Sequence, residues 1–140
     1  MSDLFDLSGK VAVVTGGSRG MGREMILAFA QHGADVVIAS RKLDACEELA
    51  EEVRDTTGRQ ALPVACHVGY WDQWDALCDT VYDEFGRCDV LVNNAGLSPL
   101  YPSLYEVSEE LYGKVMDVNL KGPFRLSAVF GKRMFDSDGG

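Results

Sequence analysis

A glycine-rich stretch near the N-terminus has the composition best suited to hold a phosphate. Residues 15–22 read Thr-Gly-Gly-Ser-Arg-Gly-Met-Gly, after the apolar run Val11–Val14 and before a segment of helical periodicity that starts near Met21. Glycines allow a sharp turn and let a diphosphate approach the backbone, and a helix start offers unpaired N–H groups and a positive dipole end. Because a buried strand precedes the glycines and a helix follows them, we predict a dinucleotide pyrophosphate site here.

Two arginines lie where the adenosine ribose of such a dinucleotide is expected. An NAD site usually has an acidic residue at the end of the second strand, about 20 residues beyond the glycines. Here Ile38-Ala39 is followed by Ser40 and Arg41, and Arg19 lies within the glycine-rich run. A guanidinium suits a 2′-phosphate because it donates bidentate hydrogen bonds and stays charged. We therefore favour NADP(H) as the cofactor; under the alternative, NAD(H), Arg41 is simply a solvated residue.

Composition limits the remaining possibilities. One hundred and forty residues with a net charge of -9 fit a single domain and make sequence-independent nucleic-acid binding a poor expectation. No apolar stretch approaches the roughly 20 residues that span a bilayer, and the acidic N-terminus at Met1–Asp6 lacks the layout of a signal peptide. No metal site is expected, because the four cysteines form no Cys-x-x-Cys pair and the two histidines have no recognisable ligand spacing. We interpret the cysteines as reduced apolar residues and expect a cytoplasmic protein without membrane or nucleic-acid partners.

The expected elements alternate between short apolar strands and helices. Such alternation implies parallel strands joined by right-handed crossovers, hence an α/β, Rossmann-type, doubly wound parallel sheet with strand order 3-2-1-4. Pro63 favours an edge position for the third strand, and Pro123 should kink the last helix or remove one backbone bond. The predicted strands are 10–15, 36–39, 62–68 and 89–92, and the helices are 21–32, 43–57, 71–85 and one that starts near Ser108.

Three motifs in this order closely resemble the short-chain dehydrogenase/reductase family. They are the glycine-rich run at 15–22, Asn-Asn-Ala-Gly at 93–96, and Asp-Val-Asn-Leu-Lys-Gly at 117–122. The resemblance covers essentially the whole chain, which corresponds to about the first half of a typical family member. It implies that 1–140 is a single, incomplete NAD(P)-binding Rossmann domain, the N-terminal part of the protein, truncated before a fifth strand.

The resemblance also implies roles for individual residues. Asn119 is similar to the catalytic asparagine that keeps a water in the proton relay, and Asp89 and Asn93 resemble the positions that hold the central sheet together. His67 stands where the family commonly has an aspartate beneath the adenine; a polar strand end without a ligand contact is the alternative. With the two arginines included, the expected cofactor-binding residues are Gly16, Ser18, Arg19, Gly20, Met21, Gly22, Arg41, His67, Val68, Asn94, Ala95, Gly96 and Val118.

The rest of the expected catalytic machinery is missing from the sequence. The family uses a tyrosine, with a lysine four residues later that lowers its pKa, and a serine that polarises the carbonyl. No Tyr-x-x-x-Lys occurs in this chain, and an unassisted tyrosine, with a pKa of about 10, is a poor base near neutrality. We therefore expect an oxidoreductase that transfers hydride between a small-molecule carbonyl and a secondary alcohol, with the 140-residue chain alone inactive. The alternative is a catalytically inactive dinucleotide-binding fragment or an NADP(H)-sensing module.

The last helix carries an expectation about assembly. In family members this helix often lies at a subunit interface, so the full-length protein is expected to be a homo-oligomer, a dimer or a tetramer. An apolar outer stripe through Val115, Val129 and Phe130 would fit an interface, and packing of these residues into the core is the open alternative.

Overall fold

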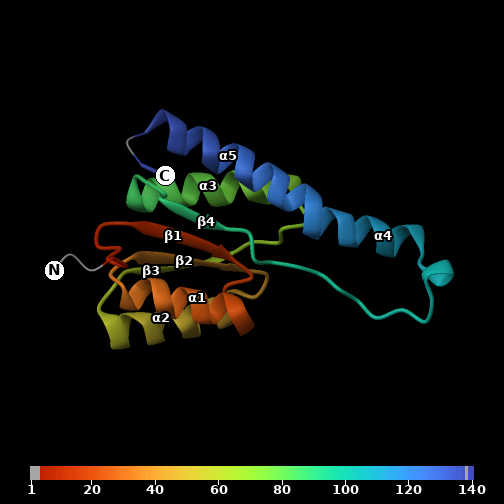
Figure 1. Cartoon of the computed structure of the whole chain (residues 1–140), viewed down its shortest axis with the longest axis horizontal. Helices are drawn as coiled ribbons and strands as arrows, with labels where there is room; N and C mark the ends of the chain where they lie inside the picture. The colour runs from red at the N-terminus through yellow and green to blue at the C-terminus, as the bar shows by residue number, and fades with distance from the viewer. Residues whose placement is uncertain (1–3, 138) are drawn as a thin grey trace.

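The computed structural model describes residues 4–137 and 139–140, and in this part of the chain helices cover both faces of one sheet (Figure 1). Helices α1 and α2 cover one face, and α3 and α5 cover the other. The expectations for Met1–Asp3 lie outside the described residues. No helix in the described ranges is long and apolar enough to cross a membrane.

The elements follow the predicted alternation, and most boundaries agree with the prediction to within one residue. The two differences are at the end of the third strand and within the last helix. The elements are β1 (Val11–Thr15), α1 (Gly20–Gln31), β2 (Asp35–Ser40), α2 (Leu43–Thr57), β3 (Ala61–Ala65), α3 (Trp71–Phe85), β4 (Val90–Val92), the 3-10 helix η1 (Leu104–Glu106), α4 (Glu109–Met116), the π-helical turn η2 (Asp117–Lys121) and α5 (Gly122–Asp136).

The sheet has the predicted topology. Within the described residues its four strands are all parallel and lie in the order β3-β2-β1-β4, so the predicted order 3-2-1-4 is confirmed. In β1 the strand partners of Val13 are Val37 of β2 and Leu91 of β4. The chain adds β2 and β3 on one side of β1 and β4 on the other side. The carboxyl end of β1 therefore lies at the switch point, where open α/β sheets bind ligands.

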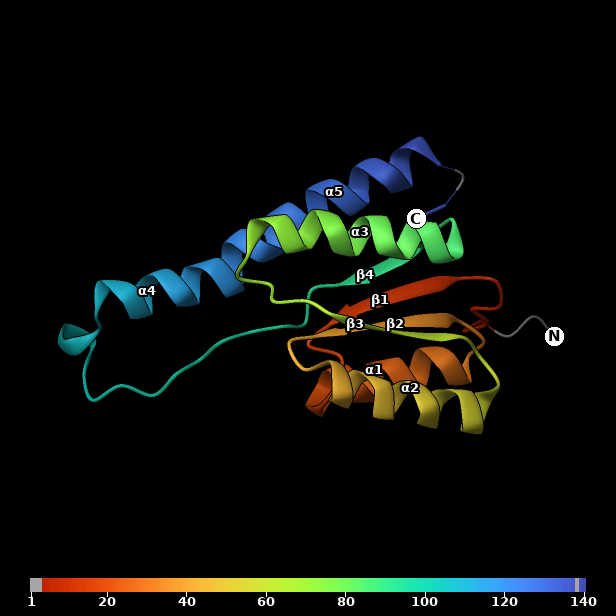
Figure 2. The same ribbon diagram turned by 180° about the vertical axis from the view of Figure 1, so that it is seen from behind.

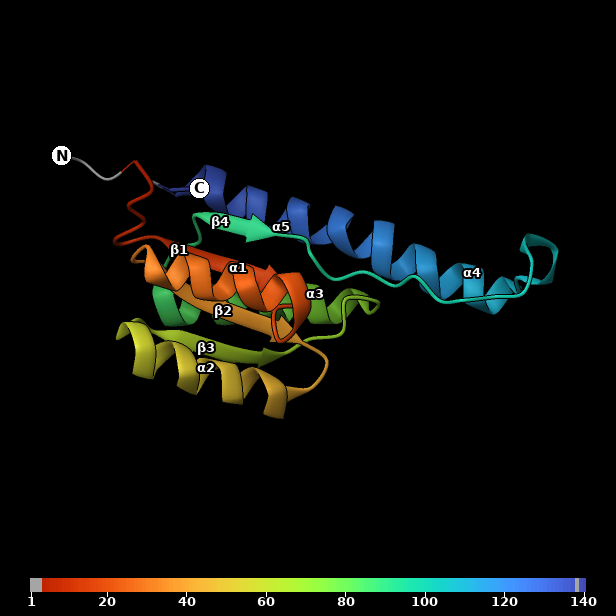
Figure 3. The same cartoon turned by 60° about the horizontal axis from the view of Figure 1, so that its bottom comes forward.

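Alternate residues of the central strands point into two separate cores. On the β1 strand Val13 packs on the side of α3 and α5, and Val14 packs on the side of α1 and α2. Both are fully buried. This two-sided burial explains why the strands read as unbroken apolar runs rather than as alternating ones. Figure 3 shows α1 and α2 side by side over their face of the sheet.

The third strand ends earlier than predicted. We expected it to extend to Val68, whereas β3 stops at Ala65. The N–H of Cys66 still donates to Ser40 O at 2.8 Å, but that of His67 donates to the side chain of Gln73 at 2.7 Å. Since a side chain takes the place of the β2 ladder, the chain leaves the sheet at His67 and turns into α3.

The last helix consists of α4, the π turn η2 and α5, which follow one another without a break. It starts near Ser108 as predicted, and the Ser108 side chain caps it by accepting from the N–H of Leu111 at 3.1 Å. We expected Pro123 to kink the helix or remove a bond. In the structure the π turn η2 ends at Lys121, and Pro123 occupies the first turn of α5. Gly122 N donates to Asp117 O, five residues back. A π turn and a helix start both tolerate a missing N–H, so the proline is accommodated at the junction.

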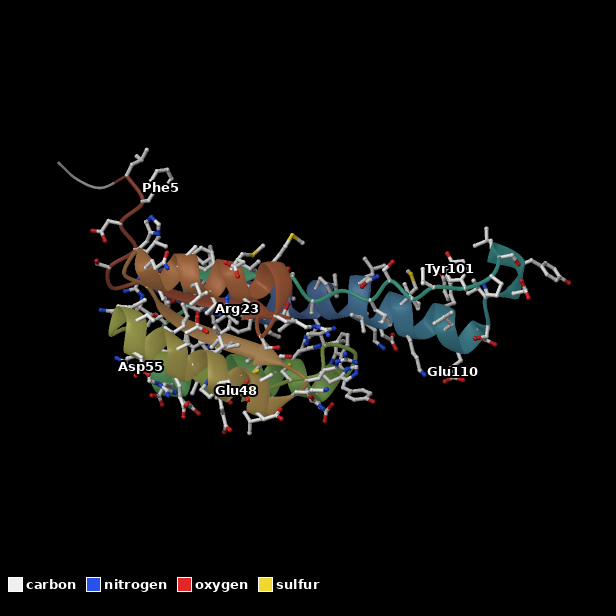
Figure 4. All side chains as sticks on the ribbon, turned by 90° about the horizontal axis from the view of Figure 1, so that it is seen from below. Phe5, Arg23, Glu48, Asp55, Tyr101 and Glu110 are labelled. Atoms are coloured by element: carbon white, nitrogen blue, oxygen red, sulfur yellow. The ribbon has the colours of Figure 1, made fainter. Side chains whose placement is uncertain are left out.

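Helix α4 and the segment that leads to it project away from the sheet (Figure 2). The chain leaves β4, runs out along this projection, and returns through η1 and α4 to α5. In Figure 4, Tyr101 and Glu110 lie on this projection, remote from Arg23 between α1 and α2. Of the expected apolar outer stripe, Phe130 proves fully buried in the α3–α5 core, so that member of the stripe is a core residue.

Candidate cofactor and catalytic site

The glycine-rich turn connects β1 to α1 at the carboxyl edge of the sheet. Gly16 and Gly20 have left-handed φ angles of 62° and 57°, which only glycine adopts freely. A Cβ added at Gly22 would lie 2.2 Å from the carbonyl oxygen of Gly16 and 2.6 Å from Asn94 Nδ2. Gly22 therefore lets the first turn of α1 pack directly on the loop. Gly16 and Gly20 are needed for their backbone angles, whereas Gly22 is needed for this close approach.

Gly20 differs from the other two glycines because its neighbourhood is open. A Cβ built there would meet no atom within 4 Å. Among the described residues, no side chain caps the N-terminus of α1, and its first turn contains no acidic residue. The start of α1 thus has no side-chain cap, and the space beside Gly20 is open, which suits the binding of a diphosphate to the helix N–H groups and dipole end. Met21, in the same turn, has a 74% exposed side chain.

Thr15 joins the end of β1 to the end of β4. Its side chain is 1% exposed, and its Oγ1 accepts from the N–H groups of Asn94 and Ala95, both at 3.1 Å. Asn94 Nδ2 in turn donates to the carbonyls of Thr15 and Gly16, each at 3.1 Å. The predicted Asn94 and Ala95 are therefore brought against the glycine turn, and the two strand ends form one rigid edge.

The two arginines proposed for a 2′-phosphate are the ones without a partner. Arg19 and Arg41 are both exposed, and within the described residues neither guanidinium has a hydrogen bond or ion pair. Their loops are joined by the hydrogen bond from Ser18 Oγ to Ser40 Oγ at 3.0 Å. Every other arginine of the chain reaches an acceptor, and these pairs are Arg23 with Glu52, Arg54 with Ala61 O, Arg59 with Asp35, Arg87 with Asp89, Arg125 with Asp75 and Arg133 with Asp79.

His67 and Val68 follow β3 at the same edge of the sheet. The Nδ1 of His67 accepts from the N–H of Gly69 at 3.0 Å, and its ring stacks on Tyr70 with the centroids 4.4 Å apart. Val68 is 8% exposed and belongs to the core cluster with Trp74. His67 is thus half-buried and can reach a ligand, whereas the side chain of Val68 is used for packing.

The third motif returns the chain to this edge. Both polar atoms of the Asn119 side chain bind Leu97: its Oδ1 accepts from Leu97 N and its Nδ2 donates to Leu97 O, each at 2.8 Å. Gly96 lies beside Asn119 as well, since a Cβ there would be 3.7 Å from Asn119 Oδ1. Because Pro123 has no N–H, the carbonyl of Asn119 lacks the donor that a regular helix would supply four residues on. Val118, in the same π turn, packs against the α3–α5 core.

Nucleophilic cysteine and metal chemistry have no support at this edge. Burial raises the pKa of the Cys66 thiol, next to His67, to about 11, and a protonated thiol is neither a nucleophile nor a metal ligand. All four cysteines are free and buried, as expected for apolar residues. In the described ranges no three residues among His, Cys, Asp and Glu gather into a potential metal site.

Comparison with known proteins agrees with this geometry. A family model described as short chain dehydrogenase matches residues 10–140. The short chain dehydrogenase pigC of Monascus ruber is 36% identical over 139 residues, which is 95% of this chain and 46% of that protein. This chain belongs to the short-chain dehydrogenase family.

Two solved structures share the fold of this short-chain dehydrogenase chain. A metagenomic short-chain oxidoreductase in complex with NADP superposes with a TM-score of 0.91 at 35% identity, over 96% of this chain and 60% of that one. A xylitol dehydrogenase with bound NAD+ superposes with a TM-score of 0.89 at 25% identity, over 96% of this chain and 51% of that one. The chain spans about half the length of the proteins it matches.

The sequence did not indicate three residues that organise the edge. Thr15 was part of the glycine motif without a role, although a buried hydroxyl at the end of an apolar strand is a signal of a hydrogen-bonding function. Ser40 and Gln73, which fix Ser18 and the backbone of His67, act through tertiary contacts that sequence spacing does not reveal.

Proposed function

We propose that this chain is the cofactor-binding half of an NADP(H)-dependent short-chain dehydrogenase that interconverts a small-molecule carbonyl and a secondary alcohol. The observation that carries the proposal is the pairing of an uncapped, open glycine turn with two unpartnered arginines, Arg19 and Arg41. When bound, the nicotinamide would supply or accept the hydride. The chain itself would hold the diphosphate on the N-terminus of α1 through backbone N–H groups.

The cofactor preference rests on charge at one corner. Arg41 follows β2 directly, and Arg19 precedes α1, so both cations flank the position where a ribose 2′ substituent would lie. No acidic residue occupies the end of β2, where a carboxylate would accept from a free 2′-hydroxyl and repel a phosphate. Solved structures with this fold hold NADP in one case and NAD+ in another, so the fold alone does not decide the preference.

The remaining proposed site residues follow the edge in order. Gly16, Ser18, Gly20, Met21 and Gly22 would surround the diphosphate. His67 and Val68 would lie toward the base, and Asn94, Ala95, Gly96 and Val118 toward the nicotinamide half. Asn119 would serve the proton relay, and the support for this role is that Pro123, four residues on, has no N–H to donate to its carbonyl.

Two further parts of the proposal concern the whole protein. We propose that it assembles as a dimer or a tetramer through the last helix, because Leu120 and Phe124 expose 59% and 66% of their surface on this helix. The cytoplasmic location stays a prediction. Because this chain has no Tyr-x-x-x-Lys, the competing proposal of a binding-only chain applies to residues 1–140 taken alone.

Titration calorimetry with NADPH and NADH tests the cofactor assignment. We expect NADPH to bind more tightly than NADH. Arg41→Ala should lower the affinity for NADPH about tenfold or more and change NADH binding little. The reason is that Arg41 can make its charge-assisted hydrogen bond only to the 2′-phosphate, which NADH lacks. Arg133→Ala, on α5 and remote from the glycine turn, is the matched control and should leave both affinities unchanged. Equal affinity for the two nucleotides in the unmodified protein would refute NADP(H) specificity.

A further inference from the structure

Two contacts hold the imidazole of His67, and a third holds its backbone. Its Nδ1 accepts from Gly69 N at 3.0 Å, its ring stacks on Tyr70, and its own backbone N–H is bound by Gln73 Oε1 at 2.7 Å. A side chain fixed in this way has its rotamer entropy removed in advance, as is usual for a binding residue.

The contact with Gly69 also fixes the tautomer. A ring nitrogen that accepts from a backbone N–H carries no proton itself, so in the neutral ring the proton is on Nε2. No residue in the described part of the chain binds Nε2. His67 therefore presents a free hydrogen-bond donor, and no acceptor, at the carboxyl edge of the sheet.

The strand order places this donor opposite the base of a dinucleotide. With the diphosphate on the β1–α1 turn and the ribose at the end of β2, the adenosine half extends along the order β1-β2-β3. The base then lies at the carboxyl end of β3, the strand that His67 follows. This step rests on the proposed function.

We infer that His67 donates through Nε2 to the base, and that the site consequently accepts hypoxanthine in place of adenine. Adenine offers acceptors at its ring nitrogens and a donor at its 6-amino group, whereas hypoxanthine offers an acceptor oxygen at position 6. A donor on the protein that binds N7, which is an acceptor in both bases, suits either base. A carboxylate at the same place would accept from the amino group of adenine and repel the oxygen of hypoxanthine, so it would discriminate between them.

The test compares the dissociation constants of NADP+ and of nicotinamide hypoxanthine dinucleotide phosphate for the intact protein by calorimetry. We expect the two constants to agree within about threefold in the unmodified protein, and His67→Asp to favour adenine about tenfold or more. Tyr70→Phe is the matched control, because it keeps the ring stack and the donor and removes only the neighbouring hydroxyl. The ratio of the two constants should not change in this variant.

The outcomes separate the role of His67 from the proposed function. If the unmodified protein rejects the hypoxanthine nucleotide by tenfold or more, or if His67→Asp weakens both nucleotides equally, the role of His67 is refuted and NADP(H) binding stands. If neither nucleotide binds, both proposals fail. If His67→Asp does not fold, the ratio of the two dissociation constants in the unmodified protein is by itself the test of the role of His67.

Discussion

At the residue scale, the glycine turn is held together by contacts that tolerate no added atom. Gly22 contacts the carbonyl of Gly16 so closely that a methyl group there would overlap a backbone atom, which cannot move as a flexible side chain could. Gly131, on the exposed side of α5, has open space around its Cβ position and an ordinary helical backbone. The two glycines therefore respond to alanine in opposite ways.

We predict that Gly22→Ala destabilises the protein by about 1–3 kcal/mol, the usual cost of overpacking, and abolishes NADPH binding. Gly131→Ala should instead raise the free energy of unfolding by up to about 1 kcal/mol, because alanine has the higher helix propensity. Urea denaturation and calorimetry measure both effects. Unchanged stability and nucleotide binding in Gly22→Ala would contradict the close packing of Gly22 against the Gly16 carbonyl.

Asp89 anchors the start of β4 to the start of β1. Its side chain is 6% exposed, and its carboxylate accepts from Val11 N at 2.9 Å and from Arg87 Nε at 2.8 Å. Burial alone would raise the pKa of this carboxyl, but the hydrogen bonds from Arg87 and Val11 and the charges of Arg87 and Lys10 lower it below its usual 3.8. The folded protein therefore stabilises the ionised form of Asp89.

We predict that Asp89→Asn lowers the free energy of unfolding by about 1–3 kcal/mol at neutral pH, since the buried network loses its negative charge and one of its two acceptor oxygens. A lowered folded pKa means that this stabilisation is complete above pH 3.8 and is lost as the pH falls through the folded value. The difference between the two proteins should therefore shrink below pH 3.8. Asp83→Asn, an exposed carboxylate on α3, is the control, and an equal effect at this position would contradict a specific role for Asp89.

At the element scale, the sequence predicted the layers well and their junctions poorly. The apolar runs of β1 and β2 and the glycines after α2 and α3 sufficed for the strand order and the helix ends, because burial and left-handed caps leave local patterns. The early end of β3 depends on Gln73, which lies six residues beyond His67, and no local pattern reveals this bond. Pro123 indicated a break in the last helix, but a proline alone does not specify a π turn.

The candidate site was predictable to a similar degree. Its glycines, Arg41 and Asn94 follow from motif chemistry, because their spacing places them at one edge of a parallel sheet. That Arg19 and Arg41 lack partners, unlike the other arginines, could not be predicted, since the pairing of surface charges depends on tertiary contacts.

The π turn η2 fixes the segment that follows β4. Both hydrogen bonds from Asn119 to Leu97 depend on an amide, which donates and accepts at once. We predict that Asn119→Asp accelerates hydrogen exchange of the Leu97 amide and its neighbours about tenfold, because a carboxylate would face the Leu97 carbonyl without a proton to donate. Lys121→Ala, an exposed residue of the same turn, should leave exchange at Leu97 unchanged. Equal exchange rates in both variants would show that the side chain of Asn119 does not hold this segment.

At the scale of the whole molecule, the residues proposed to bind the cofactor lie at one edge of the sheet, and that sheet ends at β4. Within the described residues β4 pairs only with β1, and its Val90, Leu91 and Val92 are all partly exposed. Tyr105 and Tyr112 lie on the projection formed by η1 and α4, where 98% and 60% of their surface is exposed. No tyrosine of the chain is followed by a lysine four residues later, so none has the neighbour that would lower its pKa toward neutrality.

Binding and turnover should therefore separate in the 140-residue chain. We predict that it binds NADPH and does not oxidise it in the presence of ketones, aldehydes or sugars, because Asn119 alone cannot deliver a proton to a carbonyl oxygen. Absorbance at the nicotinamide band measures turnover, with a full-length short-chain dehydrogenase as the positive control. Turnover that is proportional to the concentration of the purified chain, and that disappears with Gly22→Ala, would overturn the prediction, since it would place a proton donor among residues 1–140.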